Sequence, residues 1–181
     1  MMIDREKSGL LLIDMQEKLV PLVAEHRDCI AHCQWMLGIA QTLNIPIFTT
    51  QQYPQRLGAT VKPLQTLIDT QRIINKIAFS VMQEPEGAAV IKASGKTQWV
   101  LIGIETHVCL LQSALGLKEA GHDVFVVHEA TQARSPHDKT IAIERLRHAG
   151  VQIITREMAV FEWLRVAGTA EFKRINEGFI K

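Results

Sequence analysis

Three side chains of complementary reactivity stand far apart in the chain, each close to the end of a short apolar run. Asp14 ends the run GLLLID, Lys76 ends RIINK, and Cys109 follows QWVLIGI. A thiol, a carboxylate and an ammonium group can together perform nucleophilic catalysis on a carbonyl, because the carboxylate takes the thiol proton and later activates water. The sequence therefore predicts a covalent mechanism if the fold brings the three side chains together.

Each of the three residues also has an ordinary structural interpretation. A lone cysteine beside an apolar helix is more often a small buried hydrophobe. Asp14 by itself could cap a helix starting at Met15, and Lys76 by itself would usually be a solvated surface residue. What favours the catalytic interpretation is that all three stand at predicted strand ends.

Short apolar runs alternate with longer amphipathic stretches along the chain. Strands are predicted at 9–14, 45–50, 72–76, 98–104, 123–127 and 151–155, and helices at 28–43, 86–94, 108–120 and 139–149, with a loop at 51–63 and short terminal helices within 159–179. This alternation is typical of parallel βαβ units, and strands apolar at every residue fit burial on both faces. The predicted fold is α/β, with a single domain over 1–181. It has three layers (α/β/α) around a six-stranded parallel sheet in the Rossmann-like order 3-2-1-4-5-6.

In that order the first and fourth strands are neighbours, so Asp14 and Cys109 should face each other in the crevice at the carboxyl edge of the sheet. Cys109 would stand at a helix N-terminus, where free N–H groups and the helix dipole favour a thiolate, and a nearby Lys76 would favour it further. Backbone N–H groups of 104–108 could form an oxyanion hole beside the sulfur.

Composition argues against several other classes of protein. The chain has 181 residues, of which 47% are hydrophobic, and its 20 basic and 19 acidic residues nearly balance. There is no basic stripe for nucleic acid, no apolar run long enough to cross a bilayer, and no signal peptide at the polar start. We therefore expect a cytoplasmic protein with a small-molecule substrate, without nucleic-acid or membrane partners. Cys29, Cys33 and Cys109 should be reduced thiols.

Two histidines and two cysteines near the start of the first predicted helix suggest a metal site. The spacing of His26, Cys29, His32 and Cys33 fits no common zinc pattern. Cys29 and Cys33 are four residues apart, which fits an inward helical face. We predict no metal and no cofactor.

Taken in order, the motifs resemble the isochorismatase-like cysteine hydrolase superfamily. The resemblance rests on LLLIDMQ, K-x-x-F-S, GIETHVC, GHDVFVVHEATQAR and AIERLRHAGVQIITRE, which span nearly the whole chain. It implies Asp14 as general base, Lys76 as electrostatic partner and Cys109 as nucleophile. It also implies a non-proline cis peptide between Ile104 and Glu105, and an oxyanion hole made by the backbone N–H groups of Glu105 and Cys109.

The segment TTQQYPQRLG is most similar to the branch of isochorismatase domain-containing proteins with unassigned substrates. Nicotinamidases of the superfamily hold a metal with an Asp-x-His pair in this region, where this chain has Gln51, Gln52 and Tyr53. Nicotinamide is therefore a less favoured substrate. True isochorismatases cleave a vinyl ether without needing the cysteine, so Cys109 favours C–N amidohydrolase or acyl chemistry on a small amide, ureide or acyl compound. Relatives self-associate, which implies a homo-oligomer.

The predicted lining of the substrate pocket is Gln51, Tyr53, Phe79 and His107, and Arg134 is expected to anchor the loop after the fifth strand. A second hypothesis is a thiol-based redox or ligand-binding protein of the same fold without turnover. It is less favoured because sensing needs neither the aspartate nor the lysine. A Rossmann nucleotide-binding module is disfavoured because IDMQEK stands where G-x-G-x-x-G would follow the first strand.

Overall fold

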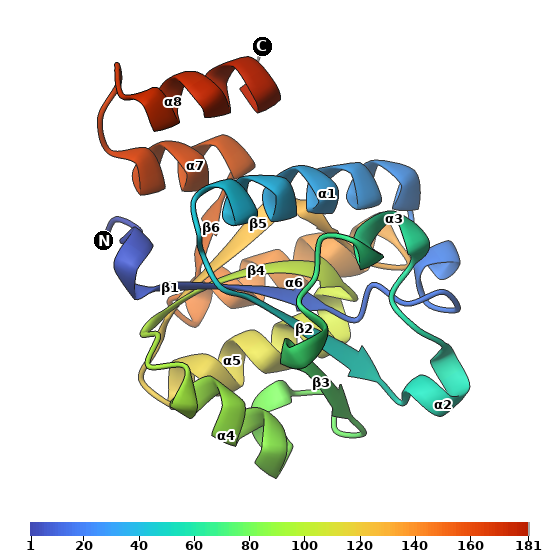
Figure 1. Cartoon of the computed structure of the whole chain (residues 1–181). Helices are drawn as coiled ribbons and strands as arrows, with labels where there is room; N and C mark the ends of the chain where they lie inside the picture. Colours follow the sequence, from blue (N-terminus) through green and yellow to red (C-terminus); the bar gives the residue numbers. More distant parts are fainter. Residues whose placement is uncertain (181) are drawn as a thin grey trace.

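The computed structural model describes residues 1–180. An all-parallel sheet of six strands, in the order β3-β2-β1-β4-β5-β6, forms the centre of the molecule, with helices on both faces (Figure 1). This confirms the fold class and the strand order predicted from the sequence. The expected single domain over 1–181 includes Lys181, which lies outside the described residues.

The strands are β1 (Ser8–Ile13), β2 (Ile47–Gln52), β3 (Ile73–Lys76), β4 (Gln98–Ile104), β5 (Asp123–Gln132) and β6 (Gln152–Ile154). The helices are α1 (His26–Thr42), α2 (Pro54–Leu57), α3 (Lys62–Gln65), α4 (Pro85–Ala93), α5 (Leu111–Glu119), α6 (Pro136–His148), α7 (Arg156–Leu164) and α8 (Ala170–Ile175). Short π-helical turns cover Thr106–Leu110 and Asn176–Ile180. Within residues 1–180, none of the helices is both long and apolar enough to span a membrane.

Alternating side chains of the central strands enter two separate cores. Leu10 and Leu12 of β1 pack with α1, α7 and α8, whereas Leu11 and Ile13 pack with α4, α5 and α6 on the other face. Successive residues of a strand point to opposite faces, so a sheet covered on both sides needs apolar residues at nearly every position. This requirement explains why β1 and β4 are continuous apolar runs.

Several predicted elements differ from the structure at the edge of the sheet where Asp14 and Cys109 lie. β2, predicted at 45–50, continues to Gln52. β5 continues past the predicted 123–127 to Gln132, and it joins β4 again at Gly103 and Ile104 after an irregularity in the register. The helix predicted at 108–120 begins instead with the π-helical turn Thr106–Leu110, and regular α5 starts only at Leu111. The carboxyl end of β4 is therefore flanked by backbone that departs from regular geometry on both sides.

Close contact between β1 and β4 depends on a glycine at the end of β4. Gly103 has φ of +110°, and a Cβ atom there would collide with the backbone carbonyl oxygen of Ile13. Gly95 also has a positive φ, but a Cβ atom there would meet no atom within 4 Å. Alanine at Gly95 therefore adds only backbone strain, whereas alanine at Gly103 adds backbone strain and a collision.

We predict that Gly103→Ala destabilises the protein by about 2 kcal/mol more than Gly95→Ala, because overpacking against a rigid backbone adds to the conformational cost. Urea unfolding of the two variants measures the difference. Equal losses of stability would show that β4 and β1 adjust to the added methyl group.

Candidate active site

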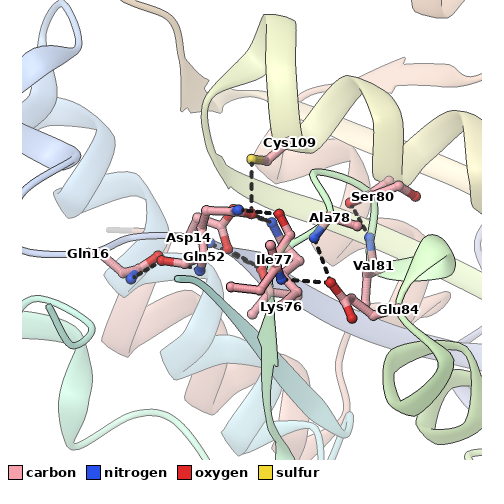
Figure 2. Close-up of polar contacts among 12 residues, drawn as sticks. Asp14, Gln16, Gln52, Lys76, Ile77, Ala78, Ser80, Val81, Glu84 and Cys109 are labelled. Atoms are coloured by element: carbon pink, nitrogen blue, oxygen red, sulfur yellow. Dashed lines mark hydrogen bonds and ion pairs between the residues drawn. The ribbon is translucent and has the colours of Figure 1, made fainter. Parts of the chain in front are cut away.

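The carboxyl ends of four adjacent strands meet at one edge of the sheet and supply the polar side chains shown in Figure 2. Asp14 follows β1 directly, Gln52 and Lys76 are the last residues of β2 and β3, and Cys109 lies in the turn after β4. Gln52 and Lys76 are also register partners in the sheet. Parallel pairing therefore brings together side chains that are distant in the sequence.

Asp14 and Lys76 form a fully buried ion pair. Lys76 Nζ lies 2.7 Å from Asp14 Oδ2, and both side chains have an exposed fraction of 0%. The other carboxylate oxygen of Asp14 accepts a hydrogen bond of 2.6 Å from the hydroxyl of Thr50. Two donors in fixed positions orient the two carboxylate oxygens of Asp14.

Gln52 is a polar residue of the site that sequence reasoning did not select. Its Oε1 accepts hydrogen bonds from Lys76 Nζ at 2.5 Å and from the Cys109 thiol, with Sγ at 3.8 Å. Its Nε2 donates to the carbonyl of Ile77 at 2.7 Å. A glutamine does not titrate and has many structural uses, so no signal in its residue type marks it. Only its place at the end of a strand could have singled it out.

Cys109 is 5% exposed and packs among apolar side chains, with Gln52 as its hydrogen-bond partner. Burial raises the pKa of the Cys109 thiol to about 12. The negative charge of Asp14 raises this pKa as well, and the positive charge of Lys76 opposes the rise. Lys76 favours the thiolate as expected, but loss of solvation outweighs it, so the net shift is opposite to the one that the sequence predicts and favours the protonated thiol.

An ion pair anchors the loop between β4 and Cys109. The Ile104–Glu105 peptide bond is cis, and the Glu105 side chain is 5% exposed. Arg134 Nε donates to Glu105 Oε1 at 2.6 Å, and a second guanidinium nitrogen lies 3.3 Å from Oε2. Arg134 was expected to anchor its own loop after β5. The structure shows that its partner is Glu105, which directly precedes the turn Thr106–Leu110 that contains Cys109. Bidentate pairing fixes both the position and the orientation of a carboxylate.

The four residues predicted to line the pocket lie in different surroundings. Tyr53 and Phe79 are 42% and 50% exposed, and His107 is partly buried, with an Nδ1 atom that has no hydrogen-bond partner within residues 1–180. Gln51 is 9% exposed, and its amide donates to the hydroxyl of Thr60 at 3.0 Å. Gln51 thus contacts a different segment from Asp14, Lys76 and Cys109, and it is the neighbouring Gln52 that reaches the thiol.

The cysteines of α1 point into the core rather than toward a shared site. Within residues 1–180 the structure contains no group of three or more His, Cys, Asp or Glu side chains placed to hold a metal ion. Cys29 and Cys33 are buried in the core beneath α1, and Cys33 Sγ donates to the carbonyl of Ala130 at 3.5 Å. They therefore act as small core residues.

Comparison with known proteins places the chain in a family. Residues 8–158 match the family model of the isochorismatase domain. The chain belongs to the isochorismatase family. It is 33% identical over 174 residues to a secreted isochorismatase effector of Phytophthora sojae, and the match covers 94% of this chain and 83% of that protein.

Solved structures that are similar to this chain share its architecture over nearly the whole length. A structure described as the MAR1 ribonuclease of Caenorhabditis elegans superposes with a TM-score of 0.92 at 30% identity, covering 100% of this chain and 93% of the other. The YcaC gene product of Escherichia coli, described as an octameric hydrolase of unknown specificity, gives 0.91 at 25% identity, covering 99% and 91%. The family is one of hydrolases, and the match leaves the substrate open.

We predict that Lys76→Met destabilises the fold by about 3–5 kcal/mol, because it leaves the Asp14 carboxylate buried without its cation. Removing both charges in the double variant Lys76→Met/Asp14→Asn should recover much of that loss, since no uncompensated charge then remains. Urea unfolding of the single and double variants measures both effects. Strictly additive losses would contradict a direct coupling between the two side chains.

Proposed function

We propose that this isochorismatase-family protein is a cysteine hydrolase that cleaves a small amide, ureide or acyl substrate through a covalent thioester on Cys109. The observation that carries the proposal is the buried Asp14–Lys76 ion pair at the strand edge where the Cys109 thiol lies. A buried ion pair contributes little net stability, so its presence in a crevice beside a thiol favours a catalytic use.

In the first half-reaction the Asp14 carboxylate takes the thiol proton as sulfur forms a bond to the substrate carbonyl carbon. The carbonyl oxygen then carries a negative charge, and the backbone N–H groups of Glu105 and Cys109 are the proposed donors to it. Collapse of this intermediate breaks the C–N or C–O bond, and the leaving group takes the proton held by Asp14. The products are a thioester on Cys109 and an Asp14 carboxylate ready to act again.

In the second half-reaction Asp14 removes a proton from water, and the resulting hydroxide attacks the thioester carbonyl. The carbon–sulfur bond breaks, and the thiolate takes back the proton from Asp14. Lys76 keeps Asp14 oriented and charge-balanced in both halves, with its ammonium 2.7 Å from the carboxylate. No cofactor enters this scheme, because every proton is carried by Asp14.

Apolar groups stand near the catalytic lysine. Ile77 directly follows Lys76 and is 63% exposed, and Phe79 is 50% exposed. Tyr53 is tied to the same segment through a backbone hydrogen bond of 2.8 Å to the Lys76 carbonyl. Exposed apolar side chains of this kind favour a substrate that has an apolar part beside its reactive carbonyl. Within residues 1–180 His107 Nδ1 has no hydrogen-bond partner, so it is available to a polar group of the substrate.

The alternative of a redox-sensing thiol fits the site less well. Oxidant sensing requires an exposed thiol of low pKa. Burial and Asp14 instead raise the pKa of Cys109, and the residue is 5% exposed. A thiol that loses its proton only to a neighbouring base serves hydrolysis better than sensing.

We further propose that the protein acts as a homo-oligomer in a reducing compartment such as the cytoplasm. The octameric description of the E. coli structure supports self-association, and free cysteines at three positions favour reducing conditions. Light scattering coupled to size-exclusion chromatography measures the assembly, and a monomer across micromolar concentrations would contradict it.

We predict that Cys109→Ala abolishes hydrolysis of any substrate found in a panel of small amides, ureides, activated esters and single-stranded RNA, without unfolding the protein. Cys29→Ala, in the opposite core, is the matched control and should retain turnover. Mass spectrometry of the native protein should show an acyl adduct on Cys109. Turnover that survives Cys109→Ala would refute the covalent mechanism.

We predict that Asp14→Asn slows acylation and deacylation each by about 10²–10⁴-fold, because the same group moves the proton in both halves. Burst and steady-state kinetics with an activated ester separate the two steps, and circular dichroism checks the fold. A variant that loses only one of the two rates would show that a second group serves as base in the other half.

A further inference from the structure

The side chain of Gln52 is held rigidly between the two charged partners and the nucleophile (Figure 2). Its amide nitrogen donates to the Ile77 carbonyl, which fixes which end of the amide faces the site. Its backbone is held as well, because Gln16 accepts from the Gln52 N–H at 2.7 Å and donates to its carbonyl at 2.9 Å. With both ends fixed, Oε1 cannot turn away from Lys76 and Cys109.

The position of Oε1 determines what the lysine ammonium can contact. An ammonium group has three donors, and Lys76 directs one to Asp14 and another to Gln52. Oε1 also accepts from the Cys109 thiol. An amide oxygen accepts hydrogen bonds and cannot donate, so it stabilises S–H and disfavours a thiolate in the same place.

We propose that Gln52 is a positioning residue that takes up one donor of the Lys76 ammonium, which would otherwise be free to serve the sulfur, and keeps the resting Cys109 as a protonated thiol. The inference rests on the proposed function, because it assigns the nucleophile to Cys109. It adds that the nucleophile is held inactive until a bound substrate allows its proton to pass to Asp14. An alkylating agent that cannot engage Asp14 in this way should therefore react slowly.

The other charged groups around the sulfur do not replace this effect. The charges that act on the Cys109 thiol are Asp14, at the end of β1, and Lys76, at the end of β3. On its own turn, Glu105 is paired with Arg134. Glu84, which precedes α4, accepts from the backbone N–H groups of the segment after Lys76, at 2.6 Å from Ile77 N. Gln52 is thus a neutral group that accepts hydrogen bonds from both the ammonium and the thiol.

Two substitutions of similar size should move the thiol in opposite directions. Gln52→Met removes the acceptor, so that a Lys76 donor can turn to the sulfur, and the pH midpoint for alkylation of Cys109 should fall by about one to three units. Gln52→Glu places a carboxylate in the same position, and the midpoint should rise. Gln98→Met is the matched control, because Gln98 is a buried glutamine (3% exposed) at the opposite end of β4.

The experiment measures the rate of iodoacetamide alkylation at Cys109 by peptide mass spectrometry between pH 7 and 11 on the full-length protein. The native protein and Gln98→Met should show rates that still rise tenfold per pH unit near pH 11, whereas the rate for Gln52→Met should rise less steeply there, because its midpoint lies at or below that pH. A general loosening of the fold would raise the rates of Cys29 and Cys33 as well, and it would raise the Cys109 rate in Gln52→Glu rather than lower it.

An unchanged or higher midpoint in Gln52→Met overturns the proposal. If Gln52→Met does not fold, Gln52→Glu decides, and a midpoint equal to or below that of the native protein overturns it. Alkylation needs no substrate, so this result is independent of the proposed function. Loss of the proposed function would appear instead as turnover that survives Cys109→Ala.

Discussion

A carboxylate and an ammonium group in contact, both removed from water, are the constraint on which the rest of the site depends. Desolvating two ions is costly, and their attraction compensates only if the geometry is good and the remaining hydrogen-bonding capacity is used. Thr50 and Gln52 supply partners to Asp14 and Lys76 respectively, which accounts for the polar residues at the end of β2. The ion pair therefore determines which residues its neighbouring strand must carry.

The same low-dielectric surroundings determine the protonation of the Cys109 thiol. They strengthen the ion pair, yet they also disfavour any additional charge, so burial outweighs Lys76 and raises the pKa of Cys109. The Asp14 carboxylate, which removes the thiol proton in the proposed mechanism, is itself one cause of that raised pKa. Only one of the two groups, the Asp14 carboxylate or the Cys109 sulfur, readily carries a negative charge at a time, and such a pair is suited to passing a proton back and forth.

The sequence predicts the parts of the fold that depend on periodicity. The bounds of β4 are those expected for 98–104, because a strand buried on both faces is apolar throughout. The end of β5 was missed because its last residues, HEATQ, are mostly polar and carry no strand pattern. The π-helical turn at Thr106–Leu110 was missed because a widened turn leaves the helical pattern of apolar residues almost unchanged. The loop expected at 51–63 contains the short helices α2 and α3.

Strand ends and motifs also locate Asp14, Lys76 and Cys109, but they do not reveal Gln52 or the protonation of the thiol. Both depend on which side chains exclude water from the sulfur, and that becomes visible only when distant segments are in place. Asp14 and Lys76 are 62 positions apart, and Gln52 and Cys109 are 57 apart.

Contacts of such long range form late in folding. An unfolded or truncated chain would therefore carry Cys109 as an ordinary exposed thiol, with a pKa of about 8.5, open to oxidants. Assembly of the sheet thus protects the cysteine chemically in the same step that brings it to Asp14, Lys76 and Gln52.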